Sequence, residues 1–294
     1  MKEAMTILAE RSLPLSEAGL LLGIVLGETR GIDYQFWQYL KNSGMLHLVV
    51  VSGANVILLT RIVVEGMASY LGRKGAIAMG FLGIWFYAGL VGWQIPVLRA
   101  SFLMFFYYLA QFGGRRYDVS RALVLTVGIM IVIDWRVLWE LSFWLSFLAF
   151  VAVVEAKDWG EIRMRGAWFY KNVFLSLWVG LWLTPILAIS FGQISIVGIL
   201  VSGLLLGVIE IATFLGGIGL FLGWLWPALG KLILWLSYPF LVYLKLLAES
   251  FGQWQGLNVR FNWLMLGGWY LVLIYFLLKR KIKRDLNKVV VIKG

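Results

Sequence analysis

Long apolar runs separated by short polar segments occupy most of this 294-residue chain. An α-helix needs about 20 consecutive, mostly apolar residues to cross a bilayer, so runs of this kind are typical of spanning helices. We therefore predict nine spans, at Leu46–Val64, Gly75–Gly92, Pro96–Phe112, Ser120–Ile133, Leu138–Val154, Val173–Ile189, Ile196–Leu222, Lys231–Leu247 and Trp263–Leu278. The fourth run is short and glycines interrupt the seventh, so these two are the least regular.

Two shorter segments precede the first span. Leu15–Gly27 is apolar but too short to cross, and it carries Gly19, Gly23 and Gly27 at every fourth position. That spacing places the three glycines on one helix face, where another helix can approach closely. Tyr34–Lys41 has apolar side chains on one side and polar ones on the other, which predicts an interfacial helix.

Composition places the chain among membrane proteins. Apolar residues make up 61% of it and the mean hydropathy is +0.86, whereas a soluble domain is about 45–50% apolar. The expected fold class is all-α, a polytopic helical membrane protein with about nine transmembrane helices and short interfacial or re-entrant helices beside them.

Residue content also excludes several kinds of chemistry. The chain has no cysteine and one histidine, so disulfides, thiolate metal sites and multi-histidine metal sites are excluded. We expect no metal, no cofactor and no enzymatic activity. The sequence lacks the phosphate-binding pattern Gly-x-x-x-x-Gly-Lys-Ser/Thr. Any work against a gradient must therefore come from another protein or from the membrane potential.

The net charge of +11 is distributed unevenly between the runs. Alternate connections are cation-rich, namely Arg73-Lys74, Arg115-Arg116, the Lys157–Lys171 loop and the Lys279–Lys288 tail. Cytoplasmic loops of membrane proteins retain Lys and Arg, so we expect these loops and the C-terminus in the cytoplasm. The predicted divisions are outer-face helices at 1–45, a transmembrane domain at 46–278 and a basic cytoplasmic tail at 279–294.

The Gly44–Val56 stretch, here called the signature segment, places polar side chains inside an apolar run. It contains the single histidine, His47, together with Ser52 and Asn55. Polar side chains within a bilayer tend to face a protein interior or a wet cavity. The glycine-x-x-histidine opening, the apolar stretch and the serine-glycine-x-asparagine ending resemble the signature of the ComEC competence family, the inner-membrane channels for transforming DNA.

Three further segments resemble that family, in the same order along the chain. Pro96–Ala100 is similar to its valine-x-arginine-alanine entry into a span. Leu141–Ala149 is similar to its leucine-serine-phenylalanine-leucine-alanine run, with Trp144 in place of a glutamine. Thr184–Ser195 resembles the proline and phenylalanine-glycine-x-x-serine segment before a long apolar stretch. The likeness covers nearly the whole chain and is to the family's channel domain.

The resemblance implies a channel in the bacterial cytoplasmic membrane that passes single-stranded DNA into the cytoplasm during natural transformation, with a separate motor protein and a separate nuclease as partners. The residues alone leave two other classes open. One is a membrane carrier for a lipid or small anion. The other is an intramembrane hydrolase using Ser52 and His47, which must lie within hydrogen-bond reach. Five positions apart on one helix, they point about 140° apart.

Each candidate residue of the DNA path has a structural alternative. His47 either contacts cargo or packs between helices. Ser52 and Asn55 share a face of the expected helix, where they line a pore, form interhelical hydrogen bonds, or do both. Arg61 falls within about 40° of His47 on that helix, but an arginine near a helix end also reaches back to the headgroups.

Arg99 lies in an apolar run with no acidic residue in its own span. A membrane arginine needs a partner, water or an anion, so it either lines a polar cavity or pairs with Glu210, the acidic residue of the seventh run. We predict that Arg99 and the signature segment line one polar interior. Ser142 and Ser146 form a small-residue stripe, which favours close helix packing over ligand binding.

Overall fold

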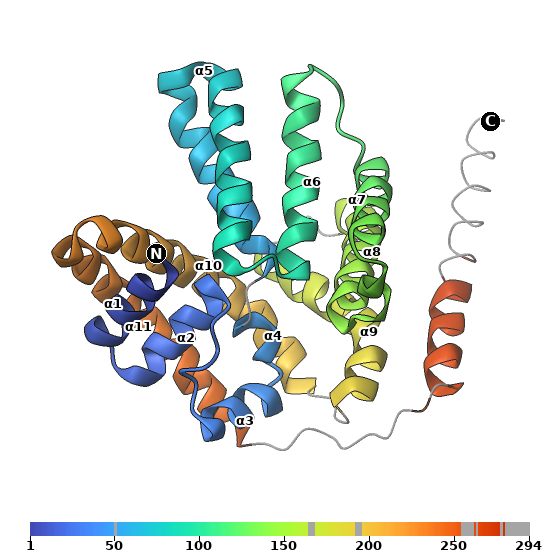
Figure 1. The fold of residues 1–294 in the computed structure, drawn as a ribbon. Coiled ribbons are helices and arrows are strands. Elements are labelled where there is room, and N and C mark those ends of the chain that lie inside the picture. The colour runs from blue at the N-terminus through green and yellow to red at the C-terminus, as the bar shows by residue number, and fades with distance from the viewer. Residues whose placement is uncertain are drawn as a thin grey trace.

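The elements of the computed structural model are helices (Figure 1). The structure describes residues 1–49, 52–163, 168–191, 196–253, 262, 264–276 and 279. Within these ranges, it describes only the backbone of residues 47, 48, 157–163, 168–173, 191, 196–204 and 206. In chain order the elements are α1 (Lys2–Ser12), α2 (Leu15–Leu26), α3 (Tyr34–Asn42), α4 (Leu46–Val49), α5 (Gly53–Val91), α6 (Ile95–Phe112), α7 (Val119–Ile133), the 3₁₀ helix η1 (Trp135–Trp139), α8 (Leu141–Arg163), α9 (Trp168–Phe191), α10 (Ile196–Leu225) and α11 (Pro227–Gly252). A last helix runs over Leu264–Phe276.

Each of the nine predicted runs overlaps a helix, so the all-α class is confirmed. Within the described residues, four helices are long and apolar enough to cross a membrane: Gly53–Val91, Ile95–Phe112, Gly207–Leu225 and Pro227–Gly252. These helices support a multi-pass membrane protein. The count of nine spans is not established by these lengths and stays a prediction.

Helix α5 is a hairpin rather than one straight rod. At Gly72 the backbone adopts φ 67° and ψ 169°, which folds the second half of α5 back along the first. The two arms touch where Gly80 faces Thr60 and Val64; a Cβ on Gly80 would lie 2.6 Å from Val64 Cγ2. Two of the predicted spans are therefore the two arms of α5, and α6 packs against both (Figure 1).

The two cation-rich connections of this unit lie at the same end. Arg73, just after the α5 turn, donates a hydrogen bond to Gln111 near the end of α6. Lys74 lies over the Phe112 ring, 5.6 Å from its centroid. The α5 turn and the α6–α7 connection are both at the top of Figure 1. The side chains of the Lys157–Lys171 loop and the tail beyond residue 279 fall outside the described residues.

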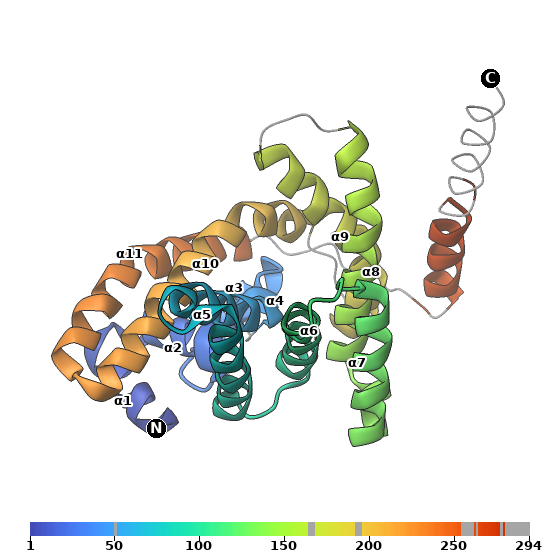
Figure 2. The ribbon, with the colours of Figure 1, turned by 90° about the horizontal axis from the view of Figure 1, so that it is seen from above.

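Helix α2 forms the centre of a second unit, built with α1, α3, α10 and α11. Ten of its residues are buried, and it contacts α1, α10 and α11. Helices α10 and α11 cross closely because glycines face each other: a Cβ on Gly223 would lie 3.1 Å from the Gly230 Cα. Viewed along the α5 arms, this unit and the α7–α8 pair lie on opposite sides of α6 (Figure 2).

The last helix is attached to α9 where a proline interrupts the hydrogen-bond ladder. Pro185 lies inside α9 and has no N–H to give to the carbonyl four residues before it, that of Leu181. Trp269 Nε1 donates to this carbonyl at 3.2 Å, and the Tyr270 hydroxyl donates to the carbonyl of Trp182 at 2.8 Å. Side chains of the Leu264–Phe276 helix thus satisfy backbone groups at the Pro185 irregularity.

Candidate functional site

The signature segment is not one continuous helix. His47 lies in the short helix α4, and its side chain is outside the described residues. Ser52 is extended, with φ −106° and ψ 158°, and α5 begins only at Gly53. The predicted helix over Leu46–Val64 is therefore wrong at its start. The angles between side chains that assume one continuous helix therefore do not apply, including the angle that placed His47 and Arg61 on one face.

Asn55 and Tyr87 cap the carboxyl end of α2. Asn55 Nδ2 donates to the Ile24 carbonyl at 2.7 Å, and the Tyr87 hydroxyl donates to the Val25 carbonyl at 2.8 Å. The two side chains lie 3.4 Å apart between Nδ2 and the hydroxyl oxygen. The last four carbonyls of an α-helix have no partner within the helix, and a buried one is costly. This geometry gives Asn55 the interhelical hydrogen bonds that were one of its two predicted roles.

Glycines let the chain pass close to α2. A Cβ on Gly19 would lie 2.7 Å from the Gly31 carbonyl oxygen, and one on Gly23 would lie 2.9 Å from that of Val49. Gly27 has a different role from the predicted packing, because its φ of 68° is left-handed and ends the helix. Glycine adopts that conformation without steric cost.

The start of α5 packs directly on the first turns of α6. A Cβ on Gly53 would lie 2.9 Å from the Ala100 Cβ and 3.4 Å from the Pro96 carbonyl oxygen. Ser52 Oγ donates to Asn55 Oδ1 at 3.4 Å, a long hydrogen bond. The end of α2, the start of α5 and the start of α6 therefore converge. We call this convergence the junction.

Arg99 lies near the start of α6, one position before Ala100 in the sequence. Its Nη1 atom is buried and has no hydrogen-bond partner in the part of the chain that the structure describes. The alternative ion pair with Glu210 is not formed, since Glu210 is exposed and no bond between the two is present. The depths predicted for the two residues from the sequence also match poorly. Arg99 is thus a cation without a described partner on α6.

The other predicted residues lie away from the junction or make ordinary contacts. Arg61 is exposed and pairs with Glu65 on the same helix, at 2.9 Å between Nε and Oε1. Ser142 and Ser146 are half-buried on α8, which packs against α9. Among the residues that the structure describes, no group of three histidine or acidic side chains comes together.

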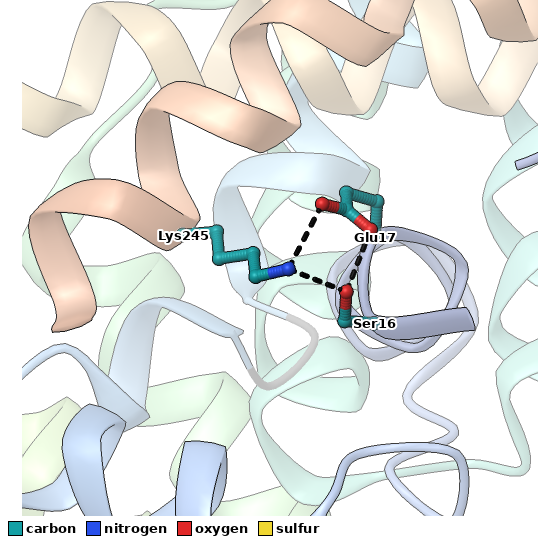
Figure 3. Close-up of polar contacts among 3 residues, drawn as sticks. All are labelled: Ser16, Glu17 and Lys245. Atoms are coloured by element: carbon teal, nitrogen blue, oxygen red, sulfur yellow. Dashed lines mark hydrogen bonds and ion pairs between the residues drawn. The ribbon is translucent and has the colours of Figure 1, made fainter. Parts of the chain in front are cut away.

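A second polar cluster joins the first turn of α2 to α11 (Figure 3). Lys245 Nζ donates to Ser16 Oγ at 2.8 Å and lies 3.2 Å from Glu17 Oε1, while Ser16 Oγ donates to Glu17 Oε2 at 2.6 Å. The Glu17 side chain is 6% exposed and that of Lys245 is 28% exposed. Ser16 and Lys245 also border a shallow hollow of about 380 Å³ between α3 and α11.

The Glu17 carboxylate is held in its charged form. Burial alone would raise its pKa, because burial disfavours the charged carboxylate. The hydrogen bonds from Ser16 and Lys245, with the nearby charge of Lys245, outweigh burial and leave the pKa of Glu17 below its ordinary value. Sequence reasoning missed this cluster, since Glu17 and Lys245 are 228 positions apart. The available signal in the sequence was that Glu17 and Lys245 are oppositely charged residues that each lie within an apolar segment.

Comparisons with known proteins agree with the resemblance read from the signature segment. A family described as Competence protein matches residues 24–283. Recombination protein 2 of Haemophilus influenzae is 25% identical over 206 residues, covering 64% of this chain and 26% of that protein. An uncharacterized protein of Aquifex aeolicus is 29% identical over 135 residues, covering 45% and 32% respectively.

A third relative is the uncharacterized protein YcaI of Escherichia coli. It is 22% identical over 148 residues, which covers 48% of this chain and 20% of that protein. The matched regions therefore span a third or less of the length of each curated relative. No solved structure matches the chain.

Proposed function

Since the chain belongs to the Competence protein family, we propose that it passes single-stranded DNA across the bacterial cytoplasmic membrane into the cytoplasm during natural transformation. The family match over most of the chain is the observation that carries this proposal. The relative named Recombination protein 2 points the same way, toward a protein that handles DNA.

The physical requirements of such a path agree with the described residues. A polyanion that crosses hydrocarbon needs a hydrated route with cations that attract phosphate without trapping it. A dense basic cluster would hold DNA too strongly. Arg99 provides one cation near the start of α6 with no described partner, in a chain with a net charge of +11. These features support a route with sparse cations.

The proposal includes a division of labour with other proteins. The sequence has no phosphate-binding loop for nucleotides, so a separate motor protein would drive the strand. With no cysteine and a single histidine, the chain would pass DNA without cutting it, and a separate nuclease would degrade the second strand. We propose the cytoplasmic membrane as its location, with the C-terminus in the cytoplasm.

The proposal is tested by reconstituting the purified chain in liposomes. A membrane potential, negative outside, is imposed, and fluorescent single-stranded oligonucleotide is added outside. External nuclease then removes whatever has not entered. Protected oligonucleotide should accumulate in liposomes that carry the protein, and neither in empty liposomes nor with duplex of the same length. Accumulation of a small anion tracer but no oligonucleotide would instead indicate a small-anion carrier.

A further inference from the structure

The hollow between α3 and α11 is lined by side chains of both charge signs. Lys245 and Glu249 lie one turn apart on α11, and Asp33 directly precedes α3. The other lining residues are polar or aromatic: Ser16, Gln35, Phe36, Tyr39 and Gln253. The volume of about 380 Å³ falls within the roughly 300–1,000 Å³ of small-molecule sites. The hollow therefore has the size and the lining for a small group that carries both charges.

Lys245 has a donor left for an anion in the hollow. An ammonium group carries three N–H donors. Two of them are used by Ser16 Oγ at 2.8 Å and Glu17 Oε1 at 3.2 Å (Figure 3). These bonds fix the position of Nζ, while the Lys245 side chain stays 28% exposed. The third donor is therefore available to a phosphate oxygen in the hollow without rearrangement of the cluster.

Two carboxylates in the lining provide acceptors for a cation. Asp33 is exposed, and its Oδ2 accepts from the Gln35 N–H at 3.0 Å, which leaves Oδ1 for a ligand. Glu249 is half-buried on α11. With Lys245, the lining carries one positive and two negative charges. This balance disfavours a bare anion such as a DNA phosphate and favours a ligand that brings its own ammonium group, which donates strongly to carboxylates.

The hollow adjoins an apolar surface of the kind that meets lipid. On α11, which is long and apolar enough to cross a membrane, Tyr243 is 45% exposed and Leu246 is 54% exposed. Leu246 directly follows Lys245 and lies one turn before Glu249. Lys245 is about 10 Å along the helix from Gly252, where α11 ends. That distance is close to the thickness of the headgroup layer on one side of a bilayer.

We propose that this hollow binds the headgroup of a membrane lipid that carries both an amine and a phosphate, a phosphatidylethanolamine. The phosphate accepts from Lys245, and the ammonium donates to Asp33 and Glu249. The acyl chains lie along Tyr243 and Leu246. The headgroup thereby bridges α3 and α11, which already pack against each other. This site goes beyond the proposed function and does not depend on it.

The site is tested by measuring lipid binding to the purified protein in detergent. Native mass spectrometry counts the lipids bound as phosphatidylethanolamine or phosphatidylglycerol with the same acyl chains is added. Phosphatidylglycerol has the phosphate but no ammonium group. The parent should therefore bind its first phosphatidylethanolamine about tenfold more tightly than its first phosphatidylglycerol, the effect of one charge-assisted hydrogen bond.

A double variant removes both negative charges from the hollow. In Asp33→Asn with Glu249→Gln, asparagine still caps α3, because it is as good a capping residue as aspartate. Phosphatidylethanolamine should bind this variant about tenfold more weakly than the parent. Phosphatidylglycerol should bind it at least as well as it binds the parent, because the lining no longer repels an anion.

The matched control is Asp118→Asn with Glu140→Gln. Asp118 is also an exposed aspartate that caps a helix, since it accepts from the Arg121 N–H at the start of α7. Glu140 is exposed, and neither residue lines the hollow. This variant should keep the lipid preference of the parent.

Three results would overturn the lipid site. The first is equal binding of the two lipids by the parent. The second is the same loss of preference in both double variants, because the effect would then not come from the hollow. The third is displacement of phosphatidylethanolamine from the parent by single-stranded oligonucleotide, since the hollow would then bind nucleic acid. DNA passage is measured separately by oligonucleotide uptake, and its failure would leave the lipid site standing.

Discussion

At the residue scale, two arginines of neighbouring helices have opposite surroundings. Arg61 is exposed and pairs with Glu65, whereas Arg99 has a buried Nη1 without a described partner. An arginine exposed to the middle of a bilayer costs at least about 2.5 kcal/mol. A membrane arginine is expected to meet a protein partner, water or an anion, and no protein partner of Arg99 is described. We propose that Arg99 meets the passing phosphates.

Substitutions at Arg99 should separate charge from geometry. Arg99→Gln should abolish oligonucleotide uptake into proteoliposomes while the protein still inserts and folds. Arg99→Lys should keep part of the uptake, because lysine supplies a point charge without the arginine fork. Arg61→Gln, which removes an exposed arginine, should behave like the parent. Full uptake by Arg99→Gln would remove Arg99 from the path.

The Glu17–Lys245 pair should contribute to stability. Glu17→Gln leaves the charge of Lys245 without its partner and should lower the free energy of unfolding in detergent by about 1–3 kcal/mol, less than for a fully buried pair because Lys245 is partly exposed. Glu65→Gln breaks an exposed pair, which solvent screens, and should have a clearly smaller effect on the free energy of unfolding. An equal loss of stability in Glu17→Gln and Glu65→Gln would mean that the buried cluster stabilises the fold no more than an exposed ion pair does.

The same pair should make stability depend on pH in the acidic range. The pKa of Glu17 in the folded protein is below its ordinary value, so its contribution is present at neutral pH and is lost as pH falls through that lowered pKa. The Glu17→Gln variant should lack this part of the acid-induced loss of stability.

Residue-scale contacts were only partly predictable from the sequence. Arg99 and Asn55 could be singled out because they are polar groups within apolar runs. Tyr87 could not, since its acceptor, the Val25 carbonyl, is 62 positions away and tyrosine is common in membrane helices. Of the two alternatives for Arg99, the ion pair with Glu210 is not formed, in line with the poor match of the depths predicted for the two residues.

At the element scale, apolar runs located the helices well and their interruptions less well. The run through the signature segment is continuous in hydropathy, yet α5 begins only at Gly53. Serine directly before a helix start is typical of an N-cap, and Ser52 was the available sign of the break. Conversely, the boundary that we predicted at the polar Arg73-Lys74 pair is correct, because the two arms of α5 meet at Gly72.

The α5 turn should depend on glycine at one position. At Gly72 the combination of φ 67° and ψ 169° is accessible almost only to glycine, so Gly72→Ala should lower the free energy of unfolding by about 1–3 kcal/mol. Gly66→Ala is the control, since a Cβ there meets nothing within 4 Å and alanine favours helix. A Gly72→Ala variant as stable as Gly66→Ala would argue against this hairpin geometry.

At the scale of the whole molecule, charge predicts how the protein lies in the membrane. The cation-rich α5 turn and α6–α7 connection lie at one end of the α5–α6 unit, as expected if both face the cytoplasm. The predicted number of spans then fixes the side of the membrane on which each remaining connection lies.

Reporter fusions in cells should determine this orientation. A reporter after Gly294 should report the cytoplasm, and one inserted between Phe251 and Asn258 should report the outside, because the positively charged loops stay in the cytoplasm. A C-terminus outside the cell would overturn the predicted span count.

The central claim, that this chain alone provides a path for single-stranded DNA, is tested most directly by recording ionic current through the protein in a planar bilayer. Under an applied voltage, single-stranded oligonucleotides added to one side should block the current for times that lengthen with strand length, as expected when a strand threads the path. Duplex DNA should produce no such length dependence. Blockades whose duration is independent of strand length would show that DNA binds at the entrance without passing, and would contradict the account.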